Sequence, residues 1–121
     1  MQVTVNSDNT YTLTAQTDAI GGAMQDTTES VVPGTATKNQ IAAITDNTFS
    51  QESSEWGIGA YNGDSGALKW YGLDTAATLK TGGNAGVDDV TTVLFGIYVD
   101  DEQAPGVYAA DVTFIATAVT D

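Results

Sequence analysis

Carboxylates are the only abundant reactive side chains in this sequence. The chain has 16 Asp and Glu residues against three Lys residues, and it has neither His nor Cys. Without His or Cys, the usual ligand sets for zinc, haem, iron–sulfur clusters and copper are missing, as are thiol nucleophiles and the Ser-His-Asp triad. Any chemistry therefore has to come from carboxylates or lysines.

The clustered carboxylates favour calcium binding over catalysis. A glycosidase mechanism needs two carboxyl groups across a cleft, whereas the acidic runs 88–89 and 100–102 lie in expected loops, where charge runs are ordinarily solvated. We therefore expect no catalytic residue and no cofactor other than Ca²⁺. Hard oxygen ligands suit calcium, so the candidate metal ligands are Asp64, Asp100 and Asp101. The segment 62–66 lacks the terminal bidentate Glu of a calcium loop, and a plain hairpin turn is the alternative.

Aromatic residues gather in the segment 55–73. Exposed rings stack on sugars, which makes Tyr61, Trp70 and Tyr71 candidate ligand-binding residues. The alternative is that a domain of this size needs its few large rings in the core, and we assign Trp56 to the core. Trp70 and Tyr71 are adjacent, so on a strand they point to opposite faces.

The three lysines permit an intramolecular isopeptide bond. Such a bond needs a buried Lys beside Asn or Asp and a carboxylic acid catalyst, and Asp111 is the acidic residue in the last expected strand. The alternative is that Lys38, Lys69 and Lys80 are simply solvated.

Alternation of apolar and polar residues predicts strands along most of the chain. In 108–118 every second residue is small and apolar or aromatic, which places these residues on one face of a strand. In 91–99 both sets of alternate positions are largely apolar, which predicts a central strand. Further strands are expected at 2–6, 10–16, 55–61 and 67–73, with 30–32 and 41–44 left open.

Turn residues between these strands predict three antiparallel pairs. The loop 100–106 is expected to join 91–99 to the last strand, and the Asn-Gly turn at 62–66 to join 55–61 to 67–73. Residues 7–9 are expected to pair the first two strands. The glycine-rich segment 81–89 is interpreted as a mobile loop.

These elements predict a single all-β domain covering residues 1–121. Seven or eight short strands with frequent turns favour an antiparallel immunoglobulin-like (Greek-key) β-sandwich. The run Gln103-Ala104-Pro105-Gly106-Val107-Tyr108 has the pattern of a tyrosine corner. We therefore expect Tyr108 to bond back to the arch before it.

The net charge of −13 excludes several partners. Nucleic-acid binding needs a basic surface, and three lysines cannot provide one. The same charge repels anionic membranes, and no apolar run approaches the roughly 20 residues that span a bilayer. The acidic surface has two alternative explanations. It keeps proteins that are densely packed on a cell exterior soluble, or it reflects selection in a salt-loving organism.

The order of these elements resembles a group of surface proteins. The Thr-rich strand at 11–14, Trp56-Gly57 in mid-chain, the Pro105-Gly106-Val107-Tyr108 turn and the last two strands are similar to Thr/Gly-rich immunoglobulin-like β-sandwich domains of prokaryotic cell-surface and surface-filament (pilin-like) proteins. The chain departs from wall-binding domains with a repeated Trp-x-Leu signature, because neither of its two Trp residues is followed by that pattern.

The resemblance also implies an incomplete sheet. In such domains one or more strands precede the position at which this sequence starts, so one sheet edge is expected to be open. An open edge is a row of unpaired backbone donors and acceptors that a strand of a neighbouring subunit can fill. A complete sheet is the alternative.

Two function hypotheses follow. The first is a non-enzymatic structural subunit whose partners are other copies of itself, with Val3, Val5, Val112 and Phe114 as candidate assembly residues. The second is a surface adhesin or carbohydrate-binding module that binds a surface glycan through the 55–73 hairpin. Both imply an extracellular or cell-surface location, although the first residues show neither the basic nor the apolar region of a signal segment.

Overall fold

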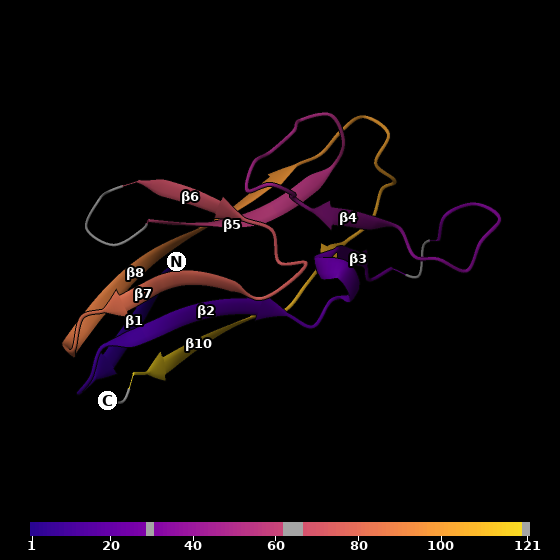
Figure 1. The fold of residues 1–121 in the computed structure, drawn as a ribbon. Coiled ribbons are helices and arrows are strands. Elements are labelled where there is room, and N and C mark those ends of the chain that lie inside the picture. Colours follow the sequence, from indigo (N-terminus) through magenta and orange to yellow (C-terminus); the bar gives the residue numbers. More distant parts are fainter. Residues whose placement is uncertain (29–30, 62–66, 120–121) are drawn as a thin grey trace.

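The computed structural model describes residues 1–28, 31–61 and 67–119, which form two packed layers of strands (Figure 1). Within these ranges the one helical element is the 3₁₀ turn η1 (Ile20–Gly22). The strands are β1 (Gln2–Ser7), β2 (Tyr11–Thr17), β3 (Met24–Asp26), β4 (Gln40–Ala43), β5 (Glu55–Tyr61), β6 (Leu68–Tyr71), β7 (Ala77–Gly83), β8 (Gly86–Tyr98), β9 (Tyr108–Ala109) and β10 (Val112–Ala118).

The two sheets differ in size and in strand direction. The larger sheet has seven strands in the order β1-β8-β5-β4-β3-β9, with β6 paired to β5. Its pairs are antiparallel except β4 with β5, which is parallel. The smaller sheet has the order β10-β2-β7 and is antiparallel throughout. The expected all-β fold is confirmed, with one antiparallel and one mixed sheet.

The core lies between the facing sides of the two sheets. In the smaller sheet, β2 contributes Tyr11, Leu13 and Ala15, each fully buried, because alternate residues of a strand share one face. The larger sheet contributes core side chains from β5 and β8, which are Trp56, Ile58, Ala60 and Val93. Trp56 also donates its indole N–H to the Gly22 carbonyl at 2.8 Å.

The expected pairing of the first two strands is wrong. β1 pairs with β8 in the larger sheet, and β2 pairs with β10 and β7 in the smaller one. Each strand has one apolar face, and Val3 and Val5 of β1 pack against the same core as Tyr11. The two strands therefore bury these faces from opposite layers, and the chain crosses between layers at residues 8–10.

The expected hairpin between 91–99 and the last strand is also wrong. β8 pairs with β1 and β5, whereas β9 pairs with β3 and β10 pairs with β2. The intervening loop docks on β3, where Thr27 donates its backbone N–H to the Val107 carbonyl at 2.7 Å. This contact carries the chain away from β8 before the last strand begins. The expectation that 91–99 is a central strand is confirmed only as far as Val93, because β1 pairs with β8 no further than this residue, whereas β5 pairs with it up to Tyr98.

Residues 81–83 and 86–89 form strand, with a two-residue turn at 84–85, in place of the expected loop. β7 continues to Gly83 and β8 starts at Gly86. Gly83 is required by packing, because a Cβ at this position would overlap the ring of Tyr11. Glycine at this position therefore allows β2 and β7 to approach closely, although glycines in a sequence are more typical of a loop.

Two local expectations are confirmed. β5 and β6 pair antiparallel as expected for 55–61 and 67–73, with Gly59 opposite Trp70, and the expected Asn-Gly turn at 62–66 lies outside the described residues. Tyr108 donates its hydroxyl to the Ala104 carbonyl at 2.6 Å and accepts a hydrogen bond from the side-chain amide of Gln103 at 2.9 Å. This is the bond back to the preceding arch that defines a tyrosine corner.

We predict that Tyr108→Phe lowers the free energy of unfolding by about 1 kcal/mol, because it removes the hydroxyl that bonds the Ala104 carbonyl. The measurement is urea unfolding, with Tyr61→Phe as the control because Tyr61 is an exposed tyrosine. Equal unfolding free energies for the two variants would contradict the role assigned to the corner.

Candidate functional site

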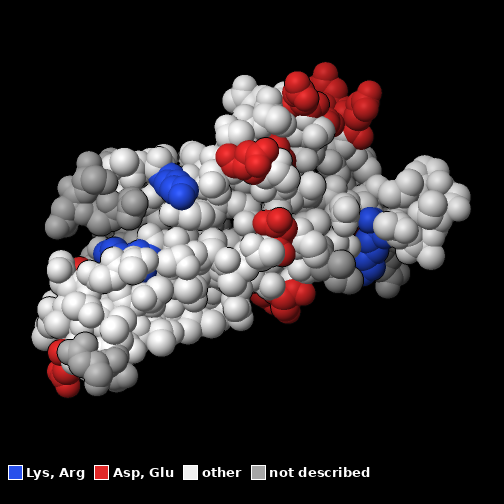
Figure 2. Space-filling view, viewed as in Figure 1, with Lys and Arg blue, Asp and Glu red and all other residues white. Residues whose placement is uncertain are grey.

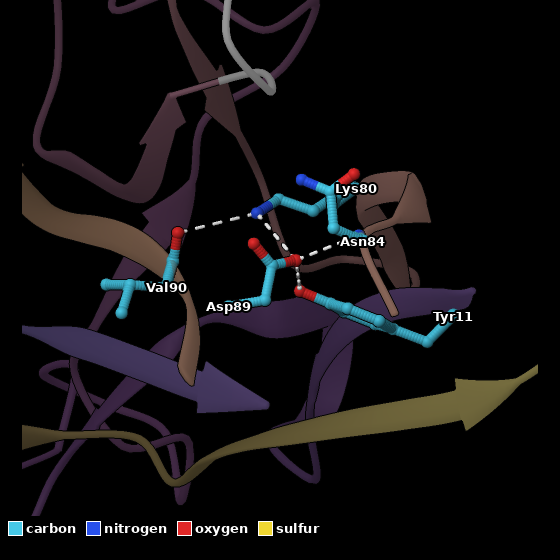
Figure 3. A network of polar contacts seen from close by, with 5 residues as sticks. All are labelled: Tyr11, Lys80, Asn84, Asp89 and Val90. Atoms are coloured by element: carbon cyan, nitrogen blue, oxygen red, sulfur yellow. Dashed lines mark hydrogen bonds and ion pairs between the residues drawn. The ribbon is translucent and has the colours of Figure 1, made fainter. Parts of the chain in front are cut away.

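A polar cluster joins the two sheets at one end of the molecule (Figure 3). Tyr11 of β2 donates its hydroxyl to the Asp89 carboxylate of β8 at 2.6 Å. The same carboxylate oxygen accepts the backbone N–H of Asn84 at 3.0 Å and lies 3.8 Å from the ammonium of Lys80. Because β2 and β7 belong to one sheet and β8 to the other, the cluster links the two layers.

The cluster is arranged for stability and not for proton transfer. Burial, followed by the hydrogen bond to Asp89, raises the pKa of Tyr11 to about 12. The hydrogen bond from Tyr11, with the nearby Lys80 charge, lowers the pKa of Asp89. A general acid or base works best with a pKa near the operating pH, and both groups are moved away from neutrality. Asp89 therefore stays ionised and Tyr11 stays protonated.

Two further carboxylates are buried, and sequence reasoning missed both. Glu55 of β5 accepts hydrogen bonds from the Ser50 hydroxyl and, at 3.0 Å, from the Gln51 backbone. Asp26 of β3 accepts the backbone N–H of Thr28 at 2.8 Å and its hydroxyl at 2.6 Å, and these bonds lower the pKa of Asp26. Glu55 and the Oδ1 atom of Asp26 are held by residues of their own loops, whereas the buried Oδ2 atom of Asp26 has no hydrogen-bond partner among the described residues.

The candidate calcium ligands do not form a cluster in the described part of the chain. Asp100 accepts the backbone N–H of Ser54 at 3.1 Å and that of Glu102 at 2.9 Å, so its carboxylate closes a turn. Asp101 is exposed, and Asp64 lies outside the described residues. Within residues 1–28, 31–61 and 67–119, no three acidic side chains are grouped so as to hold a metal ion.

Of the candidate sugar-stacking residues, Tyr61 and Trp70 lie on the outer face of the larger sheet and Tyr71 lies on its inner face. Tyr71 faces the core and is 9% exposed, whereas Trp70 lies on the outer side of the larger sheet. There the Trp70 ring packs over Gly59, and Phe49 meets it edge-on with ring centroids 5.1 Å apart. Tyr61 is exposed at the end of β5. The three rings therefore do not share one face.

The lysines have different surroundings. Lys80 lies beside Asp89, as described above, and the ammonium of Lys69 lies 5.2 Å from the centre of the Tyr71 ring. Lys38 and Asp111 are exposed. Figure 2 shows that most of the face in view is uncharged and that acidic side chains gather mainly over the loops at one end.

One edge of β8 is only half occupied. Val93 donates its backbone N–H to the Met1 carbonyl at 2.9 Å and accepts a bond from the Met1 amino group at 3.2 Å. β1 thus covers the edge of β8 from Gly86 to Val93. Backbone groups of alternate residues point to the same edge, so those of 95, 97 and 99 also point to this side. In the described part of the chain, no strand pairs with them.

The inner face of β8 is uncovered along the same stretch. Val93 is fully buried, yet the next residues on its face, Phe95, Ile97 and Val99, are 55%, 56% and 54% exposed. Two adjoining hollows of about 200 Å³ and about 370 Å³ lie beside them. Apolar side chains from both layers line these hollows: Met24, Ile41, Trp56, Tyr108, Ala110 and Val112.

We call this feature the β8 groove and define it as the open edge at residues 95, 97 and 99 together with the two hollows. Exposed large apolar side chains in a row are unusual for the inner face of a sheet, and they mark interaction surfaces. An unpaired strand edge is a template for another strand. The groove therefore has the two properties that β-strand addition requires, which are free backbone groups and pockets for alternate side chains.

Of the candidate assembly residues only Val112 lines the groove, and Val3, Val5 and Phe114 are not among the residues that line its hollows. Val3, Val5, Val112 and Phe114 are partly buried and pack against the core, and Val112 also lines one hollow. Sequence reasoning missed Phe95, Ile97 and Val99 as surface residues. Their alternation was visible, but it was interpreted as that of a strand covered on both faces.

Comparisons with protein-family models, curated proteins and solved structures found no match for this chain. Among the described residues there is no helix with the length and apolar character needed to cross a membrane.

We predict that Asp89→Asn reduces the loss of stability in acid. The folded pKa of Asp89 lies below its usual 3.8, so its contribution is present at neutral pH and is lost as the pH falls below 3.8 through the folded value. Urea unfolding at a series of pH values should give a shallower acid limb for this variant than for wild type. Asp8→Asn, at an exposed turn, is the matched control, and identical acid limbs in wild type and Asp89→Asn would refute the assignment.

We also predict that Tyr11→Phe removes a tyrosine that ionises late. The pKa of Tyr11 is raised from 10.0 to about 12, so its stabilisation is complete below pH 10 and is lost between these two values. Ultraviolet titration should show a late component in wild type that is absent from the variant. Loss of the hydroxyl should also lower the free energy of unfolding at neutral pH by about 1.5 kcal/mol. Persistence of the late component would contradict the assignment.

Proposed function

We propose that this chain is a non-enzymatic structural subunit of a prokaryotic cell-surface assembly or extracellular filament, and that it associates with other copies through β-strand complementation at the β8 groove. The observation that carries the proposal is the row of exposed apolar side chains Phe95, Ile97 and Val99, on a stretch of β8 that pairs with β5 alone among the described strands. Soluble domains usually protect an edge strand by a charge, a proline or a covering segment, and residues 94–99 contain neither a charged residue nor a proline.

The energetics favour occupation of the groove. Full burial of a large apolar side chain contributes about 1.5–3 kcal/mol, so covering the exposed halves of Phe95, Ile97 and Val99 contributes about 3 kcal/mol in each copy. Each new backbone hydrogen bond adds about 1 kcal/mol. Together these gains are comparable to the cost of lost translational and rotational freedom on association. The groove therefore supports binding only when both its edge and its hollows are filled.

The chemistry of the described acids and tyrosines supports a non-enzymatic role. Asp26, Asp89 and Glu55 are each held by hydrogen bonds within the fold. Tyr11 and Asp89 have pKa values displaced away from neutrality. These arrangements stabilise the folded chain and leave the β8 groove as the surface best suited to a partner.

We propose further that the fold is of the immunoglobulin-like type. The order β1-β8-β5 with its β6 hairpin is comparable to the sheet of such domains that contains the buried Trp, here Trp56. The tyrosine corner at Tyr108 also supports this relation, although Tyr108 begins β9 instead of the central strand of that sheet. The cell-surface location rests on the resemblance of the Thr/Gly-rich strands to surface-protein domains.

We predict that Ile97→Lys blocks self-association while the domain remains folded. Ile97 is more than half exposed, so the substitution places a charge in the groove without disturbing the core. Val87→Lys is the matched control, because Val87 lies on the same strand, outside the groove, and is 80% exposed. Size-exclusion chromatography with light scattering should give oligomers for wild type and the control, and a 12.5 kDa monomer for Ile97→Lys.

Two results would overturn the proposed function. One is a wild-type protein that stays monomeric at all concentrations tested. The other is an oligomer that Ile97→Lys leaves intact while circular dichroism shows the variant to be folded. Lysine substitutions at Val112 or Phe114 are less informative, because these side chains pack against the core and their replacement lowers stability directly.

A further inference from the structure

Two of the chain's three lysines line the same hollow. The hollow has a volume of about 350 Å³ and is lined by Lys69, Tyr71, Thr78, Leu79, Lys80 and Thr81. Lys69 lies on β6 of the larger sheet and Lys80 on β7 of the smaller sheet, so both layers contribute to it. No acidic residue is among the described residues that line this hollow. We call it the lysine hollow.

Both ammonium groups of the lysine hollow have fixed partners. That of Lys69 lies 5.2 Å from the centre of the Tyr71 ring, which is a cation–π contact. That of Lys80 lies 3.8 Å from the Asp89 carboxylate and 3.5 Å from the Val90 carbonyl oxygen (Figure 3). Asp89 offsets one of the two charges, so the hollow keeps a positive charge. Because both side chains are already ordered, binding a partner costs less conformational entropy.

The acidic feature that matches this hollow is the run Asp100-Asp101-Glu102, the longest acidic run in the sequence. It follows Val99 directly and therefore borders the end of the β8 groove. Asp101 and Glu102 are exposed. Asp100 accepts the backbone N–H of Glu102 at 2.9 Å, which fixes the turn that carries the run. The run therefore presents two exposed acidic side chains on an ordered turn.

We propose that the lysine hollow of one copy binds the acidic run 100–102 of a second copy. The inference rests on the proposed function, and it names the surface of the second copy that meets the end of the β8 groove. The hollow supplies two cations, and the run supplies the exposed carboxylates of Asp101 and Glu102. Hydrogen bonds between ammonium groups and carboxylates are stronger than those between neutral groups.

The third lysine leaves the acidic run available. Lys38 lines a different hollow together with Asp100 and Glu102, but it forms an ion pair with neither of them. Among the described residues, the one ion pair between an ammonium group and a carboxylate is that of Lys80 with Asp89. The exposed carboxylates of the run therefore have no cationic partner among the described residues of their own copy.

The proposed contact joins two different surfaces and can therefore repeat. A contact between unlike surfaces is heterologous, and it generates rings or open filaments. A copy that uses its acidic run still has a free lysine hollow, and a copy that uses its hollow still has a free run. Addition of further copies therefore continues in the same direction, which suits a filament subunit.

The net charge makes the contact selective. Copies with a net charge of −13 repel each other in most orientations, and complementary charges mainly select the orientation in which two proteins meet. At about 0.15 M salt the Debye length is about 8 Å, so repulsion between distant groups is screened while attraction at contact distance persists. The apolar row Phe95, Ile97 and Val99 then supplies affinity, and the charges determine which surface approaches it.

Charge reversal tests the contact. Lys69 and Glu102 are exposed, so their replacement leaves the core intact. Lys69→Glu and Glu102→Lys each replace an attraction by a repulsion and should weaken association about tenfold. The double variant again places opposite charges across the contact and should associate as wild type does. The measurement is light scattering over a concentration series at about 0.15 M salt, with circular dichroism to confirm folding.

Two comparisons separate the contact from an effect of net charge. Lys38→Glu changes the net charge as much as Lys69→Glu does, at an exposed residue outside the lysine hollow, and should associate as wild type does. Glu102→Lys makes the chain less acidic. Net charge alone therefore predicts stronger association for this variant, whereas the proposed contact predicts weaker association.

The expected result is a wild-type mass that rises with concentration beyond twice 12.5 kDa, with both single variants weakened and the double variant restored. The inference is wrong if the double variant stays as weak as the single ones, if Lys69→Glu associates as Lys38→Glu does, or if association stops at a dimer. The proposed function survives these results as long as Ile97→Lys blocks association. A wild-type monomer, or an oligomer insensitive to Ile97→Lys, overturns both.

Discussion

The 13-residue strand β8 connects every part of this structure, because it is longer than any strand that pairs with it. Its first half pairs with β1 and its second half with β5. Val93, where the two pairings meet, is fully buried against the core. Beyond Val93 neither β1 nor the smaller sheet follows the strand. The half-open edge and the exposed inner face are both consequences of this mismatch in length.

The two ends of β8 differ in the polarity of their surroundings. At the beginning, the Asp89 carboxylate is satisfied by Tyr11, Asn84 and Lys80 and connects the layers. At the other end no described strand pairs with the edge beyond Val93, and mostly apolar residues, together with Gln103, line the hollows beside Ile97. A carboxylate with three partners stabilises the fold by itself. An unpaired apolar edge gains stability only from a partner, which places the proposed assembly function at that end.

Residue patterns predicted local structure where the interacting residues are close in sequence. The β5–β6 hairpin and the tyrosine corner at Tyr108 are both confirmed, and each depends on contacts within about a dozen residues. Alternation also placed Trp70 and Tyr71 on opposite faces. The same patterns gave the wrong partners for β1 and β8, because an apolar face shows that a strand is covered and does not show which strand covers it.

The sequence by itself determined that the chain is all-β, that its strands each bury one face, and that His and Cys chemistry is excluded, because these follow from residue type and from the two-residue period of a strand. Only the tertiary structure decided which strands are neighbours and which apolar face lacks a cover. Phe95, Ile97 and Val99 have the alternation of a buried strand, yet they are exposed. Their exposure depends on where β1 and the smaller sheet end in space, and no local pattern in the sequence encodes that position.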